Sequence, residues 1–346
     1  MSGFDYLAAY RGKSVLVTGG AGSIGSNLCR ALAEAGANVS ILDDLSSADL
    51  WNVPVHSAIR FCEGDILDDA CRSQVFKARP TIVFHLAALF ANQHSIEQKE
   101  KDLMVNGMGT LRMLESARDA RVQRFVYSSS GCSVYGNGAP LPLLEDLVSL
   151  HLSSPYQITK TLGELYCNFY YEHYGVLVVK ARLFNSYGPG EVPGQYRNVI
   201  PNFIYWAMKR QPLPITGTGE EMRDFTYVGD IVDGLLRSGV MENAVGQEFN
   251  LGSGSEVRIL DLAAMINEAV DNPAGVEYIP RRSWDKKQRN LASIERAGNL
   301  IGYQPRTRFA DGLLQTVQWF RDNWSNIDSS ARFPQSAAPV TASIMM

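Results

Sequence analysis

A tyrosine and a lysine four residues apart are the side chains with the clearest chemical potential in this sequence. Tyr156 and Lys160 follow Ser153-Ser154-Pro155, where a serine can cap a helix and a proline suits its first turn. Residues at i and i+4 share one helix face, so the spacing predicts an ammonium beside a phenol. A phenol with a pKa near ~10 is a poor base at neutral pH, but a neighbouring cation stabilises its phenolate. We therefore expect general acid–base chemistry at Tyr156; an amphipathic surface pair is the alternative with the same spacing.

Three serines stand where a substrate hydroxyl could be bound. Ser128, Ser129 and Ser130 end an apolar run that begins at Arg124. Doubly wound sheets bind their ligands at the carboxyl ends of the strands. One of these hydroxyls could hydrogen-bond a substrate alcohol and share its proton with Tyr156. The alternative is a serine-rich turn that satisfies its own backbone.

A glycine-rich loop predicts a phosphate site. The segment Thr18-Gly19-Gly20-Ala21-Gly22-Ser23-Ile24-Gly25 joins a β-branched run to a helix-forming stretch. Gly19 suits a tight turn, Gly22 allows a pyrophosphate to approach, and Gly25 allows close packing of helix on strand. The helix N-terminus, with Ser23 and Ile24 in its first turn, then faces the phosphates. These residues are expected to bind a dinucleotide.

Acidic residues after the next two apolar runs refine the cofactor. Asp43 and Asp44 end the run 38–42, close to the ~20-residue offset at which a carboxylate accepts the ribose hydroxyls of an adenosine. A carboxylate there repels a 2′-phosphate, so we expect NAD rather than NADP. Asp65 and Ile66 follow the run 59–62 and could meet the adenine. Asp65 could equally cap the helix that follows.

Short β-branched or aromatic runs alternate with longer helical patterns through the first half of the chain, which predicts a doubly wound, Rossmann-like parallel sheet of the α/β class. The expected strands are Ser14–Thr18, Asn38–Leu42, Ile59–Cys62, Thr81–His85, Arg124–Ser128 and Leu177–Leu183. The expected helices are Ile24–Ala35, Ala70–Ala78, Glu97–Ala120, Tyr156–Tyr174 and Asn198–Lys209. We expect the NAD-binding domain at 1–187, a smaller substrate-binding lobe mainly at 188–325, and a disordered tail at 326–346.

Composition excludes several classes of function. The 346 residues carry 32 Lys and Arg against 36 Asp and Glu, a formal net charge of −4, which does not suit a nucleic-acid binder. Five scattered cysteines without C-x-x-C spacing indicate neither a disulfide framework nor a zinc site. The sequence shows no apolar stretch long enough to span a membrane and no signal-peptide pattern at its start. We expect a soluble, cytoplasmic protein without a bound metal.

The motifs together resemble the extended short-chain dehydrogenase/reductases, in particular their nucleotide-sugar epimerase/dehydratase branch. The matching segments are TGGAGSIG, LDD, HLAA, VNGMGT, YSSS, VYG, YQITK, FNSYGPG and MRDFTYVGD, in that order. The resemblance implies tightly held NAD⁺, a nucleotide-diphosphate sugar as substrate, and Ser/Tyr/Lys chemistry at a sugar carbinol. By the same match, Ala87 would contact the cofactor, Asn106 would belong to the cofactor site and orient the catalytic face, and Asn185 would contact the diphosphate. Arg223, Arg282 and Asp285 would hold the nucleotide end. Alternatively, Arg223 with Asp224 and Arg282 with Asp285 could form local ion pairs.

The residues after the serines bear on the reaction. In the 4,6-dehydratases the strand-end hydroxyl residue is followed by an Asp-Glu pair, and related decarboxylases keep a Glu. Gly131 and Cys132 stand there in this chain, so the resemblance implies C4 epimerisation through a 4-keto sugar. Alignment on the strand favours Ser130 as the catalytic serine, with Ser129 as the alternative. A 4,6-dehydratase, a UDP-glucuronate epimerase or decarboxylase, and a non-catalytic dinucleotide sensor stay open.

Two further expectations concern the sugar and the assembly. The segment 194–201, with Asn198 and Val199, resembles the substrate loop of epimerases that act on UDP-glucose or UDP-N-acetylglucosamine. Arg289 could face the hexose or solvent, so a uronic acid stays open. By resemblance to the family, we expect a homodimer in which the helices Glu97–Ala120 and Tyr156–Tyr174 pair with their copies in a four-helix bundle. Alternatively, these helix faces simply cover the sheet.

Overall fold

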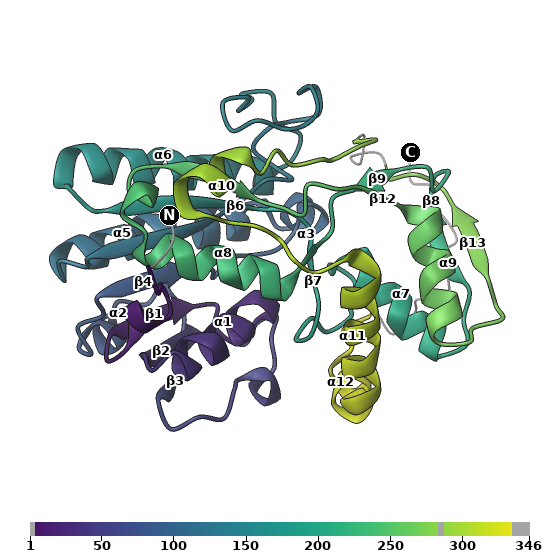
Figure 1. The fold of residues 1–346 in the computed structure, drawn as a ribbon, viewed down its shortest axis with the longest axis horizontal. Helices are drawn as coiled ribbons and strands as arrows, with labels where there is room; N and C mark the ends of the chain where they lie inside the picture. Colours follow the sequence, from purple (N-terminus) through teal and green to yellow (C-terminus); the bar gives the residue numbers. More distant parts are fainter. Residues whose placement is uncertain (1–3, 283–286, 334–346) are drawn as a thin grey trace.

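A parallel seven-stranded sheet forms the centre of the molecule, so the predicted fold class is confirmed (Figure 1). The computed structural model describes residues 4–282 and 287–333. The strand order is β11-β6-β5-β4-β1-β2-β3. The strands are β1 (Ser14–Thr18), β2 (Asn38–Asp43), β3 (Ile59–Glu63), β4 (Ile82–His85), β5 (Arg124–Ser130), β6 (Val178–Leu183) and β11 (Glu248–Leu251). Every residue of β4, β5 and β6 is buried, as expected for central strands covered on both faces.

Helices cover both faces of the sheet, and each face has its own apolar cluster. On one face lie α1 (Ser23–Glu34), α8 (Val228–Val240) and α10 (Glu295–Ile301). On the other face lie α2 (Asp69–Phe76), α5 (Gly109–Asp119) and α6 (Pro155–Tyr174). Gly163 allows α6 to approach the sheet closely, because a Cβ at that position would lie 2.1 Å from the Tyr127 hydroxyl oxygen.

The single helix expected over Glu97–Ala120 is wrong. The chain instead forms α3 (Asn92–Glu97), α4 (Lys99–Asp102), a π-helical stretch at Leu103–Met108 and then α5. The widened turn leaves Asn106 buried, one turn beyond the buried Asp102. Insertions of this kind are frequent at functional sites, and the apolar periodicity of the segment did not reveal it.

The second half of the chain builds a lobe beside the sheet, at the right of Figure 1. Its elements pack around a separate apolar cluster. They are α7 (Val199–Met208), α9 (Ile259–Ala269), α11 (Phe309–Asp322), α12 (Trp324–Ser330) and the strand pairs β7 (Ser186–Tyr187) with β10 (Thr226–Tyr227), β8 (Leu213–Thr216) with β13 (Val276–Ile279), and β9 (Met222–Arg223) with β12 (Val257–Arg258). However, α8, β11 and α10 pack in or on the central sheet. The boundary expected at residue 187 therefore does not divide the structure into two separate parts.

The disordered tail expected from residue 326 is wrong for residues 326–333. Helix α12 continues to Ser330, and its Ile327 is fully buried. Asp328 accepts a hydrogen bond from the Tyr205 hydroxyl at 2.8 Å. The Ser/Ala/Pro-rich composition did not reveal that the buried Ile327 and the hydrogen-bonded Asp328 anchor this turn. Residues 334–346 lie outside the described residues.

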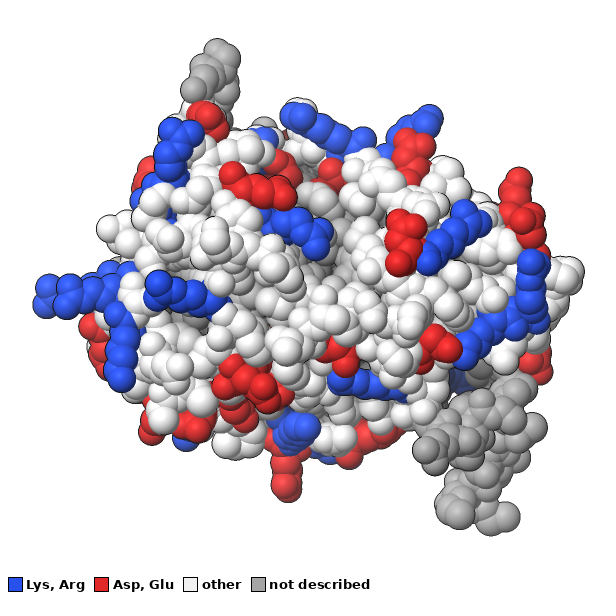
Figure 2. All heavy atoms as spheres, turned by 90° about the horizontal axis from the view of Figure 1, so that it is seen from below, with Lys and Arg blue, Asp and Glu red and all other residues white. Residues whose placement is uncertain are grey.

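The charges are mixed over the surface. In the face shown in Figure 2, the described Lys and Arg side chains are interspersed with Asp and Glu rather than gathered in one basic tract. No helix within residues 4–282 and 287–333 is both long and apolar enough to cross a membrane.

Candidate active site

A cavity of about 1240 Å³ lies between the carboxyl edge of the sheet and the lobe. Most of the predicted site residues line it. They are Gly19, Gly22, Ser23, Ile24, Gly25, Asp43, Asp44, Asp65, Ile66, Ala87, Ser130, Tyr156, Lys160, Asn185, Asn198, Val199, Arg223 and Arg282. Of the other two predicted residues, Asn106 lies behind this wall, and Asp285 is outside the described residues.

The glycine loop has the shape of a phosphate cradle. Gly19 has a φ of +72°, and a Cβ there would lie 2.7 Å from the Ala87 backbone nitrogen. A Cβ on Gly25 would lie 2.1 Å from the Gly19 carbonyl oxygen. Helix α1 begins at Ser23, and Gly22 supplies no capping side chain. The N–H groups of the first turn therefore face the cavity without a side-chain cap, which fits the pyrophosphate of a dinucleotide.

Asp43 is held firmly at the end of β2. Its carboxylate accepts the backbone N–H groups of Ala21 and Leu45, both at 2.9 Å. Burial raises the pKa of Asp43, and these two hydrogen bonds oppose the rise. Asp44 instead accepts the Ser46 N–H and hydroxyl in an exposed turn. The geometry favours Asp43 as the acceptor for ribose hydroxyls, since only its carboxylate is fixed in a buried position.

Asp65 does not cap the following helix, so that alternative is wrong. Asp68 is the N-cap of α2, and its carboxylate accepts the Ala70 N–H at 2.7 Å. Asp65 accepts the Leu67 N–H at 2.8 Å in a local turn and lines the cavity with Ile66. This position is compatible with the expected contact to an adenine.

Tyr156, Lys160 and Ser130 meet where β5 ends against α6. The Lys160 Nζ donates to the Ser128 carbonyl oxygen at 2.8 Å and lies 5.8 Å from the centre of the Tyr156 ring. Burial raises the pKa of Tyr156, and a hydrogen bond with Ser130 opposes this rise. The Ser130 hydroxyl also donates to Ser133 at 2.9 Å. The three side chains predicted to perform catalysis are therefore neighbours in space.

Burial dominates the ionisation of this group of side chains. It raises the pKa of Tyr156, and the charges of Cys132 and Asp102 add to the rise. It also lowers the pKa of Lys160 to about 8, against the opposing effect of Asp102. Desolvation thus disfavours both charged forms, the Tyr156 phenolate and the Lys160 ammonium.

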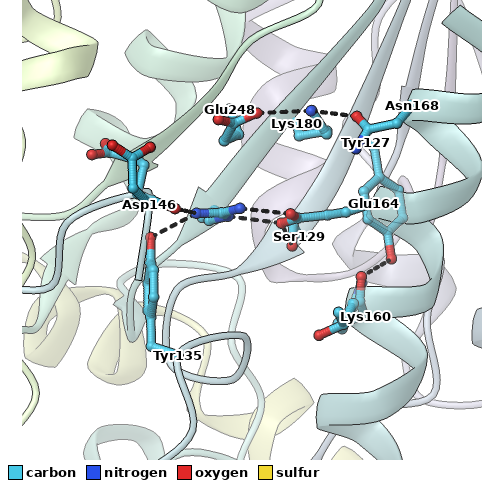
Figure 3. A network of polar contacts seen from close by, with 12 residues as sticks. Tyr127, Ser129, Tyr135, Asp146, Lys160, Glu164, Asn168, Lys180 and Glu248 are labelled. Atoms are coloured by element: carbon cyan, nitrogen blue, oxygen red, sulfur yellow. Dashed lines mark hydrogen bonds and ion pairs between the residues drawn. The ribbon is translucent and has the colours of Figure 1, made fainter. Parts of the chain in front are cut away.

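Ser129 belongs to a buried polar network behind the catalytic strand (Figure 3). Its hydroxyl donates to Glu164 at 2.5 Å, and Glu164 forms a two-pronged ion pair with Arg182 at 2.8 and 2.7 Å. Arg182 also donates to the Tyr135 hydroxyl at 3.1 Å and to the Glu145 carbonyl oxygen at 2.6 Å. The network joins β5, β6, α6 and the 135–145 loop, and therefore fixes Ser130 relative to Tyr156. It favours Ser130 over Ser129 as the serine that faces substrate.

Asn106 positions the site from behind. Its Oδ1 accepts the Leu89 N–H at 2.8 Å, and its Nδ2 donates to Asp102 at 2.8 Å. Asp102 also accepts the Thr159 hydroxyl at 2.8 Å. Asn106 thus connects the loop after β4 to helix α6, which agrees with the expected orienting role. We do not retain it as a direct contact of the cofactor, since it does not line the cavity.

The residues predicted to bind the nucleotide end of the substrate also form hydrogen bonds within the protein. Arg223 donates to the carbonyl oxygens of Lys287 and Gln288 at 3.0 and 3.2 Å. Asp224 accepts the N–H groups of Ser253, Gly254 and Ala292, so it supports loops instead of pairing with its neighbour. The Asn185 Nδ2 donates to the Asp224 carbonyl oxygen at 2.9 Å.

Arg289 does not line the cavity, and its guanidinium pairs with Glu256. Lys287 does line it and donates to the Cys132 carbonyl oxygen at 3.2 Å. Lys287 was not predicted as a site residue, because it belongs to no motif in the sequence.

Glu191 and Arg197 are two further charged residues of the cavity wall that sequence reasoning missed. Glu191 accepts the Asn198 Nδ2 at 3.0 Å, while its other carboxylate oxygen is buried without a hydrogen-bond partner. Burial raises the pKa of Glu191 to about 7, and Arg197 opposes the rise. The sequence did offer a signal for them, because they are the two charged residues of the Gly/Pro-rich stretch 188–201. Only Asn198 and Val199 were predicted as site residues in that stretch.

The fold and the site together define an α/β protein that binds a dinucleotide beside a buried Tyr-Lys pair. Residues 15–252 match the family described as "NAD dependent epimerase/dehydratase family". The chain belongs to this family, which confirms the resemblance seen in its motifs and the expected cofactor, NAD.

Three similar proteins illustrate the relationship. The UDP-glucose 4-epimerase of Mycolicibacterium smegmatis is 36% identical over 312 residues, which is 89% of this chain and 98% of that protein. The structure of epimerase Mth375 from Methanothermobacter thermautotrophicus has a TM-score of 0.94 at 56% identity and covers 95% of this chain and 98% of its own. The Bordetella bronchiseptica enzyme WbmF in complex with NAD⁺ and UDP has a TM-score of 0.82 at 36% identity and covers 93% and 96%.

Proposed function

We propose that the protein is an NAD-dependent C4 epimerase of a UDP-hexose, of the UDP-glucose/galactose or UDP-GlcNAc/GalNAc type. The observation that carries the proposal is the environment of Ser130, Tyr156 and Lys160. These side chains meet at the wall of a cavity that also holds a dinucleotide cradle. The similarity to a UDP-glucose 4-epimerase and to an enzyme crystallised with NAD⁺ and UDP supports the same substrate class.

The position after Ser130 argues against a dehydratase. A Cβ on Gly131 would lie 2.0 Å from the Phe184 ring, so a carboxylate side chain there would need Phe184 to move. Among the described residues, Asp102 is the carboxylate whose charge acts on Tyr156. It is buried against Asn106 and Thr159 and does not line the cavity. Gly131 and Cys132 therefore supply no carboxylate after Ser130 that could remove a C6 hydroxyl, so the keto sugar is expected to be reduced again.

In this scheme the protein's own side chains transfer one proton, that of the C4 hydroxyl. Tyr156 takes the proton of the C4 hydroxyl, and Ser130 hydrogen-bonds that oxygen. NAD⁺ held by the glycine loop and Asp43 would supply a positive charge and a reversible hydride acceptor for C4. Tyr156 gives its proton back to the C4 oxygen after the 4-keto sugar has turned to present its other face. Atoms and electrons balance, because substrate and product are isomers.

We assign the nucleotide end of the substrate to Asn185, Arg223 and Arg282. All three line the cavity, and guanidinium groups suit a diphosphate. Asp285 remains part of this proposal, together with Asn198 and Val199 near the hexose. The pairing of Arg289 with Glu256 removes the argument that raised a uronic acid.

We also propose a homodimer, in a reducing cytoplasm. Large apolar side chains that are more than one third exposed gather on the π-helical stretch and on α6, where the expected four-helix bundle would form. They are Leu103, Met104, Met108, Ile158, Leu165, Phe169, Tyr171 and Tyr174. All five cysteines are free thiols, which fits a reducing compartment. Light scattering that gives a strict monomer at micromolar concentration would refute the dimer.

A panel of nucleotide sugars tests the proposed activity. The protein is incubated with UDP-glucose, UDP-GlcNAc and UDP-glucuronate, and the products are separated by chromatography and weighed by mass spectrometry. We expect one of the first two to yield its C4 epimer at unchanged mass. Loss of water or carbon dioxide would favour a dehydratase or decarboxylase, and no conversion of any sugar would favour a non-catalytic sensor.

A further inference from the structure

The loop that follows Asp43 is held by an arginine from the far end of the described chain. Arg332 donates to the carbonyl oxygens of Ser46 and Ala48 at 2.7 and 2.9 Å, and to the Asp49 carboxylate at 3.1 Å. These three contacts span the loop 44–49, of which Ser46, Ser47 and Ala48 line the cavity. One guanidinium thus fixes a cavity wall from a segment more than 280 residues away in sequence.

A second arginine holds the same loop from the lobe. Arg197, which lines the cavity, donates to the Ser47 carbonyl oxygen. The two arginine-bearing segments are joined by main-chain contacts: the Gln195 N–H donates to the Arg332 carbonyl oxygen at 2.9 Å, and Gly194 forms a β-bridge with Arg332. Loop 44–49 is therefore bound by a single unit built from residues 193–197 and 331–333.

Aromatic contacts anchor that unit. Phe333 lines the cavity and packs against Tyr205 and Trp206, with ring centres 5.4 Å apart in each case. The Trp51 indole N–H donates to the Ser330 hydroxyl at 2.9 Å, just before the unit begins. The C-terminal segment is consequently a built part of the cavity rim.

The position of this rim defines its function. Asp43, the proposed ribose acceptor, immediately precedes the loop and shares its turn through Leu45. Loop 44–49 therefore borders the part of the cavity where Asp43 would hold the adenosine ribose of NAD. We propose that Arg332 and Arg197 form a clasp that closes this loop over the adenosine end and slows the release of NAD.

The hydrogen bonds of Arg332 can break and re-form without unfolding of the protein. The Arg332 side chain is 46% exposed, and two of its three partners are main-chain carbonyl oxygens. Hydrogen bonds of a charged donor are worth more than neutral ones, yet an exposed ion pair contributes little. The clasp thus combines enough contacts to delay release with enough exposure to separate without unfolding.

The test measures the release of NAD directly. Wild type and Arg332→Ala are loaded with radiolabelled NAD⁺ and chased with excess unlabelled NAD⁺, and retained label is followed over time. Arg308→Ala is the matched control, since Arg308 lies on the same lobe and its guanidinium pairs locally with Asp311. We expect the release rate to rise about tenfold in Arg332→Ala and to stay within twofold of wild type in the control. Arg332→Lys keeps the positive charge but loses the planar guanidinium, which donates several hydrogen bonds at once. Its rate of NAD release should lie between those of wild type and Arg332→Ala.

Melting curves without and with NAD⁺ separate a clasp from a merely structural contact. We expect Arg332→Ala to lose part of the thermal stabilisation that NAD⁺ gives, with little change in the NAD-free protein. Unchanged release rates would overturn the clasp. An equal drop in melting temperature with and without NAD⁺, at an unchanged release rate, would also overturn it. None of these readouts requires a sugar substrate, so failure of the proposed epimerase activity would leave the inference intact.

Discussion

The two ends of the cavity are fixed in different ways. At the catalytic end, Ser130 and Tyr156 are backed by the Arg182–Glu164 pair, whose side chains are 3% and 7% exposed. At the adenosine end, loop 44–49 is held by Arg332, whose side chain is half in solvent. A buried network fixes reacting atoms to a fraction of an ångström, whereas exposed contacts permit exchange. Catalysis and cofactor exchange therefore place opposite demands on one cavity.

The largest effect should come from the phenol itself. Tyr156→Phe removes one oxygen, so NAD and UDP-sugar should still bind while the rate falls by ~10²–10⁴-fold or more. Lys160→Ala should lower both the rate and NAD affinity. Steady-state kinetics and equilibrium binding check this, with Tyr171→Phe on the same helix as the control. More than a tenth of wild-type activity in Tyr156→Phe would assign the base elsewhere.

The next effect concerns the network behind the catalytic strand. Arg182→Met leaves the Glu164 carboxylate buried without its cation, and we expect a loss of ~3–5 kcal/mol in the free energy of unfolding. The double variant Arg182→Met/Glu164→Met should lose less than the single one, because no charge is then stranded. Urea denaturation measures both variants. A double variant that is less stable than Arg182→Met would show that the pair itself, and not the stranded charge, sets the cost.

Glu191 predicts a pH dependence at the cofactor end. Burial raises its pKa from an ordinary value of 4.5 to about 7, so the folded protein holds a proton that the unfolded chain releases. The resulting stabilisation is fully present below pH 4.5 and is lost as pH rises through 7. Glu191→Gln should remove this dependence, which is on the order of 3 kcal/mol. Urea denaturation of wild type and variant at pH 5 and 8, in saturating NAD⁺, compares the two slopes; parallel slopes would contradict the assignment.

The smallest expected effect is at the ribose. Asp43→Ala should weaken NAD binding by about tenfold to a hundredfold, because it removes charged acceptors from the ribose hydroxyls. The purified wild type should carry NAD(H) without supplementation, and the variant should lose it on gel filtration. Recovery of NADP from the wild type, or unchanged retention by the variant, would place the ribose contact elsewhere.

The same contrast explains how far the sequence could predict the structure. The glycine loop, Asp43 and the Tyr-Lys helix were predictable, because each depends on backbone geometry or spacing within one local segment. Glu164, Arg182, Arg197 and Arg332 were not, because their partners lie between 18 and 286 residues away. The π-helical stretch was missed because a widened turn leaves the apolar pattern of Leu103–Met108 almost unchanged. The order of residues 326–333 was not predicted, because overall composition does not show that a single side chain such as Ile327 is buried.

The fate of the hydrogen at C4 tests the central claim most directly. UDP-glucose or UDP-GlcNAc, whichever is turned over, is supplied with deuterium at C4 and converted in ordinary water, and the product is examined by mass spectrometry and NMR. The account predicts a C4 epimer of unchanged mass with full deuterium at C4, because Tyr156 exchanges only the hydroxyl proton and the hydride returns to the carbon it left. Deuterium lost to solvent, or a product lighter by one water, would contradict it.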